Sequence, residues 1–249
     1  MRGLFILALS LLSLNTFAAG SKIDIPKYDW SWKGFFGTYD RASAQRGLKV
    51  YREVCAGCHS MDLIAYRNLA DLGFSEAHIK AIAAEYLIPD GPNDEGEMFE
   101  REAIPSDRFA NPYPNVQAAR AANNGAYPPD LSLIVKARPK GADYLKALLL
   151  GYVEAPADKE VPEGQYYNKY MDGNLIAMPS PLSEGIVDYD DGTEATMDQM
   201  ATDVTTFLAW AAEPSLEDRK RIGLKVILFL FVLLVLAYIS KQQIWRDIK

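Results

Sequence analysis

The sequence contains only two cysteines, Cys55 and Cys58, and His59 directly follows them. A disulfide between thiols this close would close too small a loop to add much stability. A thioredoxin-like redox pair follows a strand, whereas Leu48, Tyr51 and Cys55 have helical spacing. A zinc site needs four ligands, and the adjacent Cys58 and His59 cannot both point easily at one ion.

The remaining chemistry for this pattern is covalent haem attachment, for which C-x-x-C-H is the sequence signature. Two thiols at this spacing add across the two vinyl groups of haem when the backbone turns helically. The histidine then lies under the iron as its proximal ligand. The sequence therefore predicts one haem c, bound through Cys55 and Cys58, with His59 on the iron.

Several side chains that could supply the sixth iron ligand have a simpler explanation. His78 lies in an amphipathic pattern that Ser75 would cap, so we expect a surface or core residue of a helix. Met197 and Met200 belong to the apolar stripe of a second predicted helix, which Pro214 ends. We expect both methionines in the core.

Met178 is the sixth ligand that we expect, with Met171 as the second choice. Pro179 and Pro181 follow Met178 and hold the chain extended, so that a stiff loop can carry a thioether to the haem. Methionine and histidine together stabilise ferrous iron and raise the reduction potential, which suits electron transfer. An iron with both axial positions filled has none left for oxygen or peroxide, which argues against catalysis at the haem.

The composition is that of a globular protein with one sizeable core. Of the 249 residues, 49% are hydrophobic and 24% are charged. The formal net charge of −7 argues against nucleic acid and allows a basic partner. Acidic residues concentrate in residues 90–107 and again in residues 170–218, where no Lys or Arg occurs.

The amino-terminal end has the pattern of a secretory signal peptide. Arg2 gives a short positive region, Leu4–Leu14 is apolar, and small residues follow. We expect residues 1–19 to be removed by cleavage near Ala18 or Ala19. The apolar run is too short to cross a bilayer as an uncleaved anchor.

The carboxy-terminal end has the pattern of a transmembrane helix. Residues 222–240 contain a single charge, Lys225, and would span about 28 Å as a helix. Basic residues flank this segment on both sides, so the positive-inside rule gives almost no bias. The signal peptide would set the orientation instead, with the bulk of the chain outside the cytoplasm.

Beyond these patterns, the chain resembles the cytochrome c1 family, the haem subunits of cytochrome bc1 complexes. The matching segments are "YDWSW" at 28–32, "VCAGCHSMDLIAYRNL" at 54–69, "ARAANNGAYPPDLSLIVKAR" at 119–138, "IAMPSPL" at 176–182, "DYDDGTEATMDQMATDVTTFLAWAAEP" at 188–214, and the terminal anchor. The resemblance implies an all-α fold, a cytochrome c-like haem domain with loop insertions plus one C-terminal transmembrane helix. It places the periplasmic haem domain at 20–218 and the anchor with a short cytoplasmic tail at 219–249.

The resemblance also implies a function and a set of site residues. It implies axial ligation by His59 and Met178, in agreement with the reasoning above, and a salt bridge from Arg120 to a haem propionate. The expected function is to take one electron from the Rieske iron–sulfur protein and pass it to a soluble or membrane-bound cytochrome c. The expected assembly is a dimeric complex with cytochrome b, in the inner membrane of a bacterium.

Three other functions remain open from the sequence. The chain could be a free-standing, membrane-anchored electron shuttle. A haem enzyme such as a peroxidase would need an open or labile iron. A thiol oxidoreductase would keep two free thiols and carry no haem.

Overall fold

The computed structural model describes residues 23–246, so the predicted signal peptide at 1–19 lies outside the described residues. Helices dominate, which confirms the all-α prediction. The α-helices are α2 (Arg41–Val50), α3 (Glu76–Ala84), α4 (Val116–Ala122), α5 (Ala142–Leu150), α6 (Met197–Ala212) and α7 (Leu216–Trp245). A π-helical turn at Tyr51–Cys55 continues α2, and 3-10 helices cover Tyr66–Leu72 and Asp172–Asn174.

Side-chain caps fix where four of these helices begin. Asp40, Ser75, Asn115 and Thr196 precede α2, α3, α4 and α6, and each side chain accepts a hydrogen bond from a backbone N–H of the first turn. These caps satisfy donors that the helix itself cannot pair. The predicted cap at Ser75 is confirmed.

The core forms where α2 packs against α6, and Gly47 allows the close approach. A Cβ atom on Gly47 would overlap the carbonyl oxygen of Asp203 and lie 2.8 Å from Cβ of Phe207. The Asp203 side chain is fully buried. It accepts hydrogen bonds from Ser43 Oγ at 2.7 Å and from Arg46 Nε at 2.9 Å. The buried carboxylate is therefore paired, as a charge inside a core must be.

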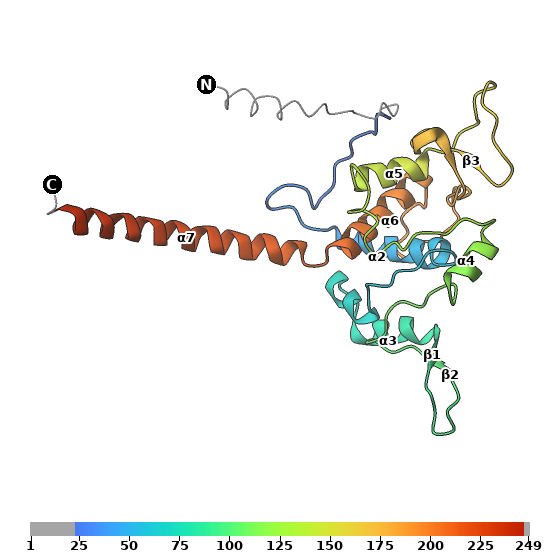
Figure 1. Cartoon of the computed structure of the whole chain (residues 1–249), viewed down its shortest axis with the longest axis horizontal. Coiled ribbons are helices and arrows are strands. Elements are labelled where there is room, and N and C mark those ends of the chain that lie inside the picture. Colours follow the sequence, from blue (N-terminus) through green and yellow to red (C-terminus); the bar gives the residue numbers. More distant parts are fainter. Residues whose placement is uncertain (1–22, 247–249) are drawn as a thin grey trace, which may run out of the picture.

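Two short antiparallel hairpins, which the sequence analysis did not predict, interrupt the helical pattern. Strand β1 (Leu87–Asp90) pairs with β2 (Phe99–Glu102), with Leu87 opposite Glu102. Strand β3 (Tyr166–Tyr167) pairs with β4 (Leu175–Ile176). The loop between β1 and β2 projects from the globular part on the side away from β3 (Figure 1).

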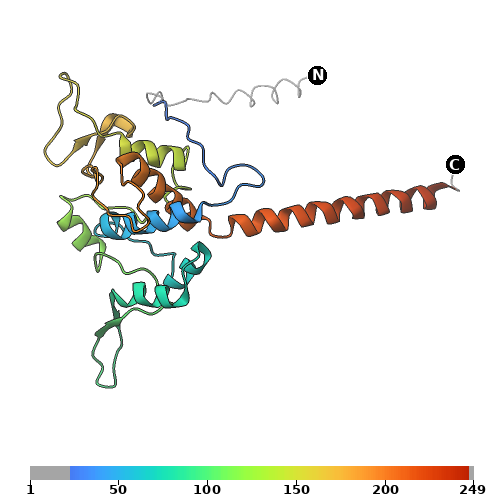
Figure 2. The same ribbon diagram turned by 180° about the vertical axis from the view of Figure 1, so that it is seen from behind.

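Helix α7 extends away from the globular part as a single long rod in both ribbon views (Figures 1 and 2). Its most apolar stretch has a mean hydropathy of 2.8, and none of that stretch is buried inside the protein. A long apolar helix without protein cover is suited to a bilayer, and it anchors the chain in the membrane. The helix starts six residues before and ends five residues after the predicted span of 222–240.

Hydrogen bonds join the first turns of α7 to the globular part. Glu217 binds the Arg41 guanidinium through two N–O contacts of 2.6 and 2.8 Å and also accepts from the backbone N–H of Tyr39 at 2.8 Å. One turn later, Lys220 Nζ donates to the carbonyl oxygens of Trp32 and Gly37 at 2.7 and 2.8 Å. The anchor is thus held at two successive turns.

Candidate functional site

The turn that follows α2 brings the motif residues to one side of the chain. The backbone N–H groups of Cys58 and His59 both donate to the carbonyl oxygen of Cys55, at 3.1 and 2.9 Å. The backbone therefore turns helically through the motif, as haem attachment requires. Among the described residues, neither cysteine is in a disulfide.

His59 is held in one orientation by a backbone carbonyl. Its Nδ1 lies 2.8 Å from the carbonyl oxygen of Pro129. A neutral imidazole that donates from Nδ1 keeps the lone pair on Nε2, which is the atom a metal would take. Burial lowers the pKa of His59, and the Pro129 carbonyl opposes that shift. The net direction favours the neutral, ligating form of the ring.

Asp130 forms hydrogen bonds that link the segment containing Pro129 to the residues just after the C-x-x-C-H motif. Its carboxylate accepts from Ser60 Oγ at 2.9 Å and from the backbone N–H of Asp62 at 2.7 Å. The backbone N–H of Leu131 donates to the carbonyl oxygen of Ser60 at 2.9 Å. Asp130 therefore positions the carbonyl that orients His59. The sequence analysis did not single out Asp130, although the Pro-Pro-Asp run marks a stiff, hydrogen-bonding turn.

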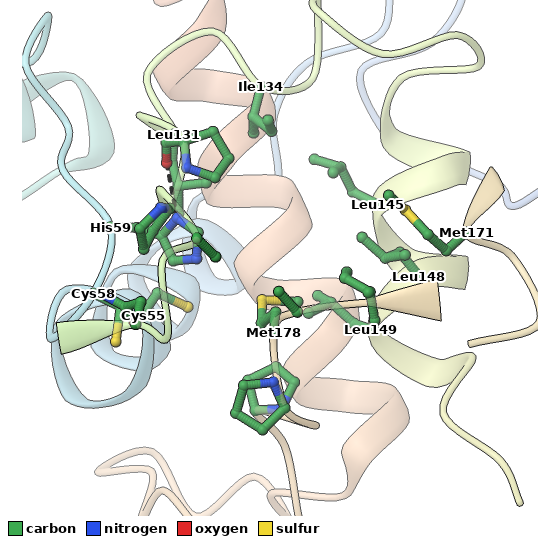
Figure 3. A pocket seen from close by; sticks show the side chains of 18 of the residues that line it. Cys55, Cys58, His59, Leu131, Ile134, Leu145, Leu148, Leu149, Met171 and Met178 are labelled. Atoms are coloured by element: carbon green, nitrogen blue, oxygen red, sulfur yellow. Dashed lines mark hydrogen bonds between the residues drawn. The ribbon is translucent and has the colours of Figure 1, made fainter. Parts of the chain in front are cut away.

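A cavity of about 590 Å³ opens beside the motif, and Cys55, Cys58 and His59 form part of its wall. Most of the lining is apolar, including Leu131 and Leu208. Figure 3 shows the three motif residues together on one side and Met178, from a separate chain segment, facing this side. The volume lies in the range of pockets that take a cofactor. Two thiols, an imidazole and a thioether on an apolar wall fit a haem c.

Met178 and Met171 both line the cavity, and different hydrogen bonds hold the two residues. Met178 comes two residues after β4, and the Tyr152 hydroxyl donates to its backbone carbonyl oxygen at 3.0 Å. Met171 lies farther from His59, beside Leu145 of α5 (Figure 3). The Tyr144 hydroxyl donates to its sulfur at 3.5 Å. Met178 therefore stays the predicted iron ligand.

The structure does not bring Arg120 to the wall of the cavity. The Nη1 atom of Arg120 donates to the carbonyl oxygen of Gly125 at 2.8 Å, and the guanidinium lies 5.8 Å from the ring centre of Tyr127. Arg138 does line the cavity. The helix α4 that carries Arg120 ends at Ala122, and its last turn directs Arg120 to the following turn of backbone. Of the two arginines, Arg138 is the one that lines the cavity, and its Nη1 donates to the backbone carbonyl oxygen of Ala137 at 3.2 Å.

Residues that the sequence analysis set aside stay away from the cavity. His78 is exposed, and its backbone N–H donates to the capping Ser75. Met200 is fully buried, as expected, but Met197 is 36% exposed, because it starts α6 rather than packing inside it. Among residues 23–246, no group of three or more His, Cys, Asp or Glu side chains could hold a bare metal ion.

The environment of Cys55 argues against thiol redox catalysis. Burial raises the pKa of the Cys55 thiol to about 12, and the neighbouring Cys58 adds to the rise. A redox-active cysteine needs the opposite shift, because the thiolate is the nucleophile.

The sequence was also compared with known proteins. The model of the Cytochrome C1 family matches residues 30–248. "Cytochrome c1" of Rhodospirillum rubrum is 49% identical over 243 residues, which cover 91% of this chain and 89% of that protein. The "Cytochrome b-c1 complex catalytic subunit, mitochondrial" of Candida albicans is 50% identical over 233 residues, covering 93% of this chain and 81% of that protein. "Cytochrome b/c1" of Bradyrhizobium diazoefficiens is 50% identical over 263 residues, but the chain spans only 38% of its length.

Proposed function

The chain belongs to the cytochrome c1 family, and from this we propose that it is the haem-bearing electron carrier of a cytochrome bc1 complex. In this role it accepts one electron from the Rieske iron–sulfur protein and passes it to a cytochrome c. The name of the Candida albicans relative, a subunit of such a complex, supports membership of a complex over a free-standing shuttle.

Five residues hold the cofactor in this proposal. Cys55 and Cys58 form the two thioether links to haem c. His59 and Met178 would be the two protein ligands of the iron, and Arg138 would pair with a propionate. When bound, haem c would supply a reversible one-electron couple between ferric and ferrous iron. The chain's own residues would exclude water from it.

The observation that carries this proposal is the composition of one cavity wall. Cys55, Cys58, His59 and Met178 come from segments about 120 residues apart in the sequence, and all four line the same apolar cavity. Hydrogen bonds hold both candidate ligands: the Pro129 carbonyl orients the His59 ring, and Tyr152 holds the Met178 backbone. Rigid ligands on both sides suit electron transfer, because the iron then changes its geometry little between oxidation states.

The placement of the protein in the cell is also part of the proposal. The apolar helix α7 anchors the chain in a membrane. We place the globular part on the periplasmic side of a bacterial inner membrane, because the first 19 residues have the pattern of a signal peptide. Cytochrome b in a dimeric complex is the proposed neighbour of the anchor.

A spectroscopic comparison of two methionine variants tests the site. Reduced-minus-oxidised spectra of wild-type membranes should show a c-type haem, and the reduced protein should not bind carbon monoxide at neutral pH. Met178→Ala should keep the haem and bind carbon monoxide, because the sixth position is then open. Met171→Ala is the matched control, and its reduced form should stay closed to carbon monoxide.

Two results would contradict the proposal. If the wild-type chain carried no covalently bound haem, the proposed cofactor would be wrong. Carbon monoxide binding by Met171→Ala but not by Met178→Ala would reassign the sixth ligand. Affinity purification in mild detergent tests the assembly separately: a b-type cytochrome and an iron–sulfur protein should co-purify, whereas a free-standing shuttle would be recovered alone.

A further inference from the structure

Two adjacent phenylalanines near the membrane anchor are largely exposed. Phe35 is 52% exposed and Phe36 is 81% exposed. Their rings pack edge to face, with centroids 4.9 Å apart and planes at 82°. Two large aromatic side chains gathered at one exposed spot indicate a surface that is covered in the working protein.

A tight turn presents this aromatic pair, and glycines on either side make the turn possible. Gly34 has a φ of +78°, a conformation that side chains with a Cβ atom rarely adopt. A Cβ atom on Gly37 would overlap the carbonyl oxygen of Lys33 and lie 2.6 Å from the carbonyl carbon of Trp32. The backbone therefore folds back closely here and leaves the two rings at the tip.

The turn is bound directly to the membrane helix. Lys220 of α7 donates to the carbonyl oxygens of Trp32 and Gly37, which flank the aromatic pair. In both ribbon views the chain segment before α2 loops out beside the first turns of α7 (Figures 1 and 2). The pair thus sits where the anchor leaves the globular part.

The position of Lys220 sets the depth of the turn relative to a bilayer. The predicted span of α7 begins at Ile222, two residues after Lys220, and the long side chain of its single charge, Lys225, can reach back to the headgroups. At a rise of about 1.5 Å per residue, Lys220 lies roughly 3 Å outside the hydrocarbon boundary. A turn bound at this level lies among the lipid headgroups, the layer in which aromatic side chains are enriched.

We propose that the aromatic turn, residues 34–37, is a second membrane contact that inserts Phe35 and Phe36 into the headgroup layer beside α7. The occupant of this surface is lipid rather than a protein subunit, because the patch is small and continuous with a helix that the bilayer already surrounds. The proposal rests on the membrane insertion of α7. It makes the haem domain a body held against the bilayer at two points.

Lipid photocrosslinking on the native chain tests this contact. The full-length haem protein, with the subunits that accompany it, is reconstituted into phosphatidylcholine vesicles that contain a lipid with a diazirine near the top of its acyl chain. Trypsin should release residues 34–41, which isolate the aromatic pair, and residues 226–241 from α7. Residues 81–101 carry the exposed Phe99 of the β1–β2 hairpin and serve as the control peptide.

Lipid adducts on peptide 34–41 should be several-fold more abundant than on peptide 81–101. Phe36→Ser should lower the adducts on 34–41 and leave those on 226–241 unchanged, whereas Phe99→Ser should change neither. One result would overturn the proposal: peptide 226–241 of α7 is labelled, but peptide 34–41 carries no more adducts than peptide 81–101. The turn would then face water or another subunit. Unlabelled 226–241 would instead show that the anchor itself is wrongly assigned.

Discussion

Two arginines near the cavity differ in what their guanidinium groups can reach. Arg138 lines the cavity, while Arg120 is occupied by the carbonyl oxygen of Gly125 and the ring of Tyr127. A positive charge close to the haem disfavours the ferric state, which carries one more positive charge than the ferrous state. Only the arginine at the cavity wall should therefore affect the reduction potential.

Arg138→Ala should lower the midpoint potential, and Arg120→Ala should leave it nearly unchanged. At a separation of about 10 Å and an effective dielectric constant of about 20, the lost interaction is about 1.7 kcal/mol, or roughly 70 mV for one electron. Redox titration of the two variants in the same membranes measures the difference. Equal shifts of the midpoint potential, or a larger shift for Arg120→Ala, would indicate that Arg120 pairs with the propionate.

The residues that could be predicted from the sequence are those whose chemistry is local. Cys55, Cys58 and His59 were identifiable because their spacing alone matches the cofactor. Asp130 and Arg138 were missed, since their roles depend on contacts made across the fold to Ser60 and to the cavity. A lone charged residue carries no pattern that reveals such a contact.

Among the elements, the packing of α2 on α6 depends on one glycine. Gly47→Ala places a methyl group against the backbone of Asp203, so the two helices must separate. We expect a loss of at least about 3 kcal/mol of stability, at the upper end of overpacking costs. Thermal unfolding of the haem protein measures the loss. Gly223→Ala, in open space on α7, is the matched control and should unfold like the wild type.

The joint between α7 and the globular part, formed by Glu217 with Arg41 and the backbone N–H of Tyr39, should weaken in acid. The Arg41 guanidinium and the backbone N–H of Tyr39 lower the pKa of Glu217 below its usual value. A depressed pKa contributes stability above the unfolded-state pKa of about 4.3, and this is lost as the pH falls through the folded-state value. Glu217→Gln should show a weakened joint already at neutral pH.

Hydrogen exchange of the segment around Tyr39 measures this joint, because its amide donates to Glu217. Protection should fall in Glu217→Gln and, in the wild type, below about pH 4. Asp218→Asn is the control, since the one ion pair of Asp218 within residues 23–246 is with Arg221 of the same helix. Equal protection in both variants would show that Glu217 does not hold the anchor.

Helices could be predicted better than hairpins for a physical reason. The caps at Ser75 and Thr196 and the apolar run of α7 are written in neighbouring residues, and each predicted helix exists. The strands β1–β4 have two to four residues each, too few for an alternating pattern to stand out. Their pairing depends on register with a partner strand, which local sequence does not specify.

At the scale of the whole molecule, the fold neutralises much of the acidic run at 170–218. Seven of its eleven carboxylates form salt bridges with Lys or Arg. They are Asp190, Asp191, Asp198, Asp203, Glu213, Glu217 and Asp218. In the β1–β2 hairpin only Asp90 is paired, with Arg101, so Glu95 and Glu97 at its tip form no ion pair within residues 23–246.

Reduction of a basic cytochrome c should therefore slow with salt, and the hairpin should account for part of the effect. Exposed charges are screened over about 8 Å at physiological ionic strength. Glu95→Gln with Glu97→Gln should lower the stopped-flow rate at low salt and flatten its salt dependence. Asp190→Asn, which removes an exposed but paired carboxylate, should have a smaller effect. A wild-type rate that does not change with salt would argue against electrostatic steering.

The double attachment of α7 to the globular part also indicates which protein moves during electron transfer. Glu217 and Lys220 bind the globular part at successive turns of α7, so the haem-binding cavity stays at a fixed distance from the membrane and at a fixed angle to it. A carrier mounted this way cannot swing between its donor and its acceptor. The distance between them must be crossed by the exchange partners, each of which has to dock, react and leave.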